Sequence, residues 1–94
     1  MEIGSDVGQL VAATHMLAEH LRGHDQDGWA DALGRAAALL ANGEAQGLYE
    51  LQRMFGGMGS LNDVALNEGS GRLEELRETV FRLAQQMDRS RLRI

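Results

Sequence analysis

Apolar residues recur at steps of three and four along most of the chain, the spacing that places side chains on one face of an α-helix. The pattern predicts a first helix over residues 6–22, with Asp6 as its N-cap and Gln9 at capping-box spacing. Gly23 is expected to end this helix, because glycine readily closes helix C-termini. The predicted core stripe comprises Val7, Leu10, Thr14, Leu17 and Leu21.

The same spacing predicts two further helices in the middle of the chain. One is expected to begin after a cap at Asp25 or Asp27 and to end at Asn42-Gly43. A shorter one is expected over residues 44–55. Their core positions are Trp29, Leu33, Ala36 and Leu40 in the first and Leu48, Leu51 and Phe55 in the second.

A glycine-rich connector, residues 56–71, separates these helices from the last one. Ser60 followed by Asp63 predicts the cap of one short helix there, and a brief extended piece is the alternative. The final segment, residues 72–91, has the strongest amphipathic pattern, with Ser70 as its expected N-cap. Its core stripe is Leu73, Leu76, Val80, Leu83 and Met87.

These elements predict an all-α fold, a small bundle of four to five helices with a glycine-rich connector before a long C-terminal amphipathic helix. We expect a single domain over residues 1–94 with its core between about residues 6 and 90, because half of this length falls near the ~40 residues below which isolated cores rarely suffice.

Composition and charge exclude several classes of protein. The chain has no cysteine, which excludes a disulfide framework and thiolate chemistry. A net charge of -5 argues against a nucleic-acid partner. No apolar run approaches the ~20 residues of a membrane span, and no secretory signal is visible, so we expect a cytoplasmic protein without a membrane partner.

The charge is uneven along the chain. Residues 1–71 carry three arginines and ten acidic residues, whereas residues 72–94 carry six arginines and four acidic residues. An acidic body suits a basic protein partner, although solubility alone also explains it.

Histidine is the first candidate for chemistry, because its unperturbed titration lies near neutrality. His20 and His24 are four residues apart and could share a metal ion, with Asp25 or Asp27 completing the shell. Gly23 argues against this, since it should end the helix between them. Helical-wheel positions place His15 and His20 away from the core stripe, in solvent. We therefore predict no metal site, no cofactor and no catalytic residue.

The segment from Phe55 to Asp63 is the most unusual part of the sequence, because glycines lose backbone entropy on folding. One interpretation is structural: a helix end, a close backbone crossing and a new cap, with Met58 and Leu61 in the core. The other is that this turn and Phe81, a large apolar residue off the final stripe, contact a partner. The predicted partner-binding residues are Gly56, Gly57, Met58, Gly59, Ser60, Asn62, Asp63 and Phe81.

Two segments, Trp29-Ala30-Asp31-x-Leu33 and Phe55-Gly56-Gly57-Met58-Gly59-Ser60-Leu61-Asn62-Asp63, resemble those of a small bacterial helical domain family of unknown function, over about residues 7–67. The resemblance implies a compact bacterial helical domain and no particular substrate. In size and charge the chain is also similar to the immunity proteins encoded beside secreted bacterial toxins.

We therefore expect a non-catalytic protein-binding module from a bacterium, with an immunity-type inhibitor as its most concrete form and a basic protein as partner. The first alternative is a homodimeric structural or regulatory module joined through the final helix and Phe81. The second is a metal- or small-ligand-binding protein that uses His20 and His24.

Overall fold

A computed structural model describes residues 3–56, 60–66 and 68–92 of the chain. In these ranges it contains four α-helices, one short 3-10 helix and no strand, which confirms the all-α prediction. In chain order the elements are α1 (Ile3–Arg22), α2 (Asp27–Ala41), α3 (Ala45–Met54), η1 (Leu61–Asp63) and α4 (Ser70–Leu92).

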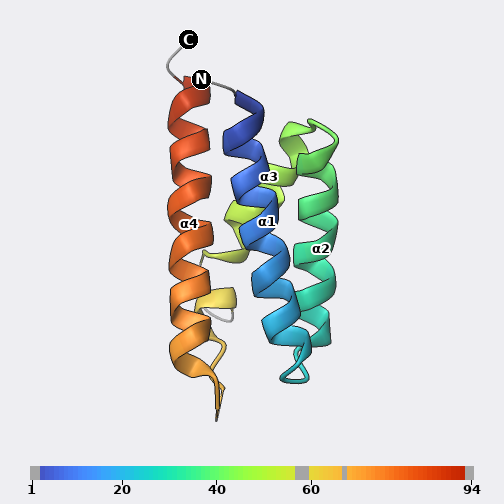
Figure 1. Ribbon diagram of the computed structural model, residues 1–94, viewed down its shortest axis with the longest axis vertical. Coiled ribbons are helices and arrows are strands. Elements are labelled where there is room, and N and C mark those ends of the chain that lie inside the picture. Colours follow the sequence, from blue (N-terminus) through green and yellow to red (C-terminus); the bar gives the residue numbers. More distant parts are fainter. Residues whose placement is uncertain (1–2, 57–59, 67, 93–94) are drawn as a thin grey trace.

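The three longer helices run alongside one another, with α1 between α2 and α4 (Figure 1). The shorter α3 crosses behind α1 and contacts both α2 and α4. The connector brings η1 against the first half of α4 before the chain turns into that helix (Figure 1). This arrangement gives one layer of three helices with α3 and η1 packed across it.

The predicted stripes form the core. Their leucines at positions 10, 17, 21, 33, 48, 51 and 73 are almost completely buried. Thr14 is also buried, and its hydroxyl donates to the Leu10 carbonyl at 2.7 Å, so the helix itself satisfies the polar group. Trp29, Leu83 and Met87 are half-buried and pack against the edge of this core.

Three predicted helix caps are wrong. Asp6 lies inside the first turn of α1, because that helix begins before it. Asp27 is the first residue of α2, and Gln26 occupies the N-cap position without a side-chain hydrogen bond. Ser70 is likewise the first residue of α4. The negative charges of Asp6 and Asp27 still stabilise the first turns of α1 and α2 by interacting with the helix dipole. This explains why acidic residues occur there without a capping hydrogen bond.

The turn between α1 and α2 closes as predicted at Gly23, whose amide donates to the Glu19 carbonyl. Arg22, at the end of α1, then reaches across to Asp31 in α2 at 2.8 Å. This hydrogen bond raises the pKa of the Arg22 guanidinium, whose side chain is about half exposed. The contact joins the two helices beyond the turn.

Gly47 allows α3 to cross α2 closely. A Cβ added there would lie 2.8 Å from both the Ala36 carbonyl oxygen and the Leu40 amide nitrogen. Those atoms belong to backbone that cannot move independently. A close backbone crossing thus occurs at the start of α3. The crossing predicted at the glycines after Phe55 falls partly on residues 57–59, which lie outside the described residues.

Candidate functional site

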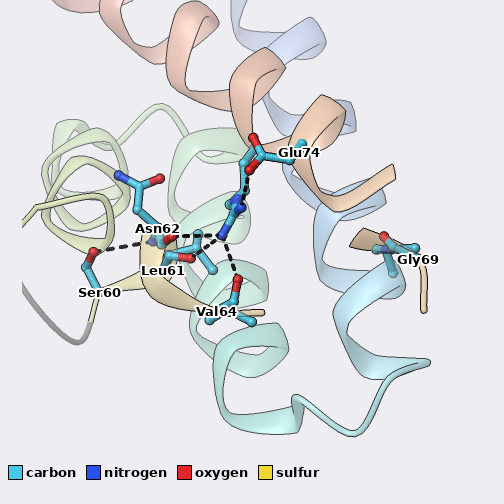
Figure 2. Close-up of polar contacts among 8 residues, drawn as sticks. Ser60, Leu61, Asn62, Val64, Gly69 and Glu74 are labelled. Atoms are coloured by element: carbon cyan, nitrogen blue, oxygen red, sulfur yellow. Dashed lines mark hydrogen bonds and ion pairs between the residues drawn. The ribbon is translucent and has the colours of Figure 1, made fainter. Parts of the chain in front are cut away.

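Arg77 organises the surface where the connector meets α4. Its side chain is about 10% exposed. Its Nη1 donates to the carbonyl oxygens of Leu61, Asn62 and Val64 at 2.9, 3.1 and 3.0 Å, and its Nη2 donates to the Glu74 carboxylate at 3.0 Å (Figure 2). The charged guanidinium thus supplies hydrogen bonds to three carbonyl oxygens of a short loop. An apolar side chain at this position could not supply them.

Ser60 and Asn62 fix the same loop from its other side. The Ser60 hydroxyl accepts from the Asn62 amide at 3.3 Å, which confirms Ser60 as the cap of the short helix η1. The side-chain Nδ2 of Asn62 donates to the Phe55 carbonyl at 2.9 Å and so links η1 to the end of α3. Ser60 and Asn62 are two of the predicted partner-binding residues, and both also stabilise the fold.

Phe81 lies beside this loop on α4 and is 42% exposed. Its ring packs against Phe55, with 5.5 Å between the ring centroids and 54° between the planes, the tilted geometry that aromatic pairs favour. One side of the ring is thereby held by the core, while the remainder faces solvent. Phe81 therefore covers the end of α3 at Phe55 while part of its side chain stays exposed.

An open depression of about 400 Å³ lies next to this ring, and we call it the Phe81 depression. Five residues line it: Asn62, Glu74, Arg77, Glu78 and Phe81. Two carboxylates and an aromatic ring therefore share one surface, whereas the guanidinium of Arg77 is directed into the loop.

Of the other predicted contact residues, the structure describes Gly56, Ser60 and Asp63. Gly56 and Asp63 are exposed, whereas Ser60 is buried at 7% exposure. Gly57, Met58 and Gly59 lie outside the described residues. Asn62 and Phe81 are the predicted residues that the depression brings together.

Sequence reasoning missed the roles of Glu74, Arg77 and Glu78. A signal for Arg77 was available, because it lies four residues after Leu73 and three before Val80, on the apolar stripe of α4. A lone arginine at such a position is seldom buried unless it is paired.

The histidines form a separate contact at the far end of the connector. His20 is half-buried rather than solvated as predicted, because its Nε2 is 2.9 Å from the Gly69 carbonyl oxygen. The rings of His20 and His24 lie 4.8 Å apart. Within the described ranges no three histidine, aspartate or glutamate side chains are grouped to hold a metal ion. His15 is exposed, as predicted.

Residues 22–75 match the model of a family described as a domain of unknown function, DUF6966. Because this match covers more than half of the chain, the protein belongs to the DUF6966 family. No match to a curated protein or to a solved structure was found.

The matched range has a clear position in the fold. It begins at the last residue of α1, contains α2, α3 and the connector, and ends in the second turn of α4. Asn62 and Glu74 lie within it, whereas Arg77, Glu78 and Phe81 follow it. Within the described residues, no helix is both long and apolar enough to cross a lipid bilayer.

Proposed function

We propose that this chain is a non-catalytic protein-binding module of bacterial origin that acts in the cytoplasm. An immunity-type inhibitor, which occludes a basic partner, is its most concrete form. The observation that carries the proposal is the partly exposed Phe81 ring, held by Phe55 beside a depression with two carboxylates.

The geometry of Phe81 suits an anchor for a partner. Aromatic residues dominate the binding energy of many protein interfaces, and an anchor that is already ordered loses less entropy when it binds. The tilted contact with Phe55 orders the ring before binding. Glu74 and Glu78 at its edge would favour approach by a basic protein.

The polar side chains around the connector are engaged within the fold, which supports a non-catalytic role. His20 contacts the Gly69 carbonyl oxygen, and its ring lies beside that of His24. Ser60 and Asn62 of the connector and Arg77 of α4 are used in holding the loop.

Capture from a lysate of the source organism tests the proposal. Immobilised wild type should retain a protein that Phe81→Asp loses, while Met16→Asp retains it. Met16 is a matched control, because it is 49% exposed on α1, away from the depression. Capture is done at low and high salt. Recovery of no protein under either condition, equal loss in both variants, or full retention by Phe81→Asp would overturn the proposal.

A homodimeric module is the second candidate, and one observation favours it. Phe81 is the large apolar side chain that α4 exposes within its described part, because Leu73, Leu76, Val80 and Ala84 are buried in the core. A dimer through α4 would therefore form around Phe81 rather than along the apolar stripe. Sedimentation equilibrium decides this: a dimer in wild type that becomes a monomer in Phe81→Asp supports it, and a monomer in both excludes it.

A further inference from the structure

We propose that the Phe81 depression receives an arginine side chain from a protein partner, with Glu78 as its counter-ion and the Phe81 ring as its stacking surface. This inference rests on the proposed function and specifies the chemistry that the site recognises.

The charges on α4 identify Glu78 as the available carboxylate. Glu74, Glu78 and Phe81 follow one another at steps of four and three, which places them along one side of the helix. The Glu74 carboxylate already accepts from Arg77. No ion pair joins Glu78 to the part of the chain that the structure describes, and this includes Arg82, one turn further along.

Arg77 does not compete for this position, although it lines the depression. Its Nη1 is occupied by three loop carbonyls and its Nη2 by Glu74. The positive charge in the wall is thus directed toward the fold. A cation from outside would meet Glu78 and the exposed part of the Phe81 ring instead.

The chain itself shows the contact that we expect at Phe81. The Arg53 guanidinium carbon lies 5.6 Å from the centre of the Tyr49 ring, four residues earlier in α3. Phe81 has glutamine, not arginine, four residues later. Its exposed face therefore has no corresponding cation on the next turn, and a partner can supply one.

Arginine fits this surface better than lysine. A planar guanidinium can stack on an aromatic ring while its edge donates two hydrogen bonds to a carboxylate. An ammonium group is more strongly hydrated and forms point contacts, so it gains less from the combination. The Asn62 side chain also lines the depression, and because its Nδ2 donates to the Phe55 carbonyl, its amide oxygen is the group left to accept a hydrogen bond.

Titration with short peptides, followed by NMR, tests the inference without the natural partner. The probes are acetylated, amidated glycine pentapeptides with arginine, lysine or citrulline at the centre. The arginine peptide should shift the Phe81 ring and Asn62 side-chain signals, and its δ-methylene protons should move upfield in the ring current. The lysine peptide should bind at least about threefold more weakly, and the uncharged citrulline peptide should not bind measurably.

Two pairs of variants locate the contact. Glu78→Gln should weaken the arginine peptide about fivefold or more, whereas Glu75→Gln, a matched change on the same helix outside the depression, should leave its affinity within about twofold. Phe81→Leu should abolish the upfield shift while remaining folded, and Met16→Leu should preserve it. Thermal unfolding of each variant identifies any loss of fold.

Three results would overturn the inference: no shift with the arginine peptide, equal binding of the citrulline peptide, or unchanged affinity in a folded Glu78→Gln variant. Its failure is distinguishable from failure of the proposed function. If a lysate protein is lost by Phe81→Asp and kept by Met16→Asp while the peptides fail, the module still binds a protein there, but without arginine recognition.

Discussion

At the scale of single residues, Arg77 is expected to have a large effect on stability. Its replacement by methionine keeps the apolar stem but leaves the carbonyls of Leu61, Asn62 and Val64 without their donor. We expect Arg77→Met to lower the free energy of unfolding by about 2–4 kcal/mol, because hydrogen bonds to a charged group are strong and unpaired buried carbonyls are costly. Urea denaturation measures the change.

Arg72→Met is the matched control for Arg77. Arg72 pairs with Glu75 at 3.3 Å, but both side chains are more than half exposed. The control should therefore change the free energy of unfolding by less than about 0.5 kcal/mol. Equal effects of the two variants would show that the loop carbonyls do not depend on Arg77.

Two glycines make a second comparison of single residues. Gly47→Ala should destabilise the protein by about 1–3 kcal/mol, because its new methyl would meet backbone atoms of α2 at 2.8 Å. Gly34→Ala should instead stabilise it by about 0.5–1 kcal/mol, because nothing lies within 4 Å of the added Cβ and alanine favours a helix. Thermal unfolding of both variants checks the opposite signs, and a shift in the same direction would contradict the close crossing.

At the scale of elements, the connector is attached at two places to different helices. Its middle is held by Arg77 of α4, and its end by His20 of α1. The Gly69 carbonyl accepts from the His20 imidazole at 2.9 Å and also from the Leu73 amide in the first turn of α4. Gly69 itself has a φ of +79°, which glycine adopts without strain. The start of α4 is thus coupled to the end of α1.

This coupling predicts local opening when His20 is removed. His20→Ala should raise the hydrogen-exchange rate of the Leu73 amide by about fivefold or more, since its acceptor loses a fixed orientation, while amides in the middle of α2 change little. His15→Ala is the control, because that side chain is exposed on the same helix. Equal exchange of Leu73 in both variants would contradict a role for His20 in holding the connector.

The helices themselves were predictable, because the apolar residues spaced three and four apart in the sequence are the residues buried in the core. The caps were less so: the wrong assignments at Asp6, Asp27 and Ser70 reflect how readily a first-turn acid or serine resembles a cap in sequence. Ser60 was identified correctly, because its partner is only two residues away.

The site was predictable only for residues that are unusual in their local sequence. Asn62 and Phe81 are conspicuous in the sequence, one in a glycine-rich turn and one off the apolar stripe. Glu74 and Glu78 resemble any exposed helix residues, and they acquire a neighbour in Asn62 only after the connector folds back on α4. No local pattern contains that long-range contact.

At the scale of the whole molecule, the family range and the folding unit differ. Residues 22–75 leave out almost all of α1 and most of α4. Of the seventeen buried apolar residues that form the core in the described chain, eight lie outside this range, including Leu10, Leu17, Leu21 and Val80. Arg77, which satisfies the connector carbonyls, also lies outside it.

We therefore predict that a fragment of residues 22–75 does not fold. It keeps α2, α3 and the connector, but the surfaces of α2 and α3 that α1 and α4 cover would be exposed to water. About fifty residues with half of the core removed cannot offset the loss of conformational entropy on folding. Far-UV circular dichroism should show little helix in the fragment and no cooperative thermal transition, whereas residues 3–92 should unfold in one transition, with the same midpoint by Trp29 fluorescence. A cooperative transition in the shorter fragment would mean that α1 and α4 cover a core that is already formed, and the Phe81 depression would then belong to an added layer rather than to the folding unit.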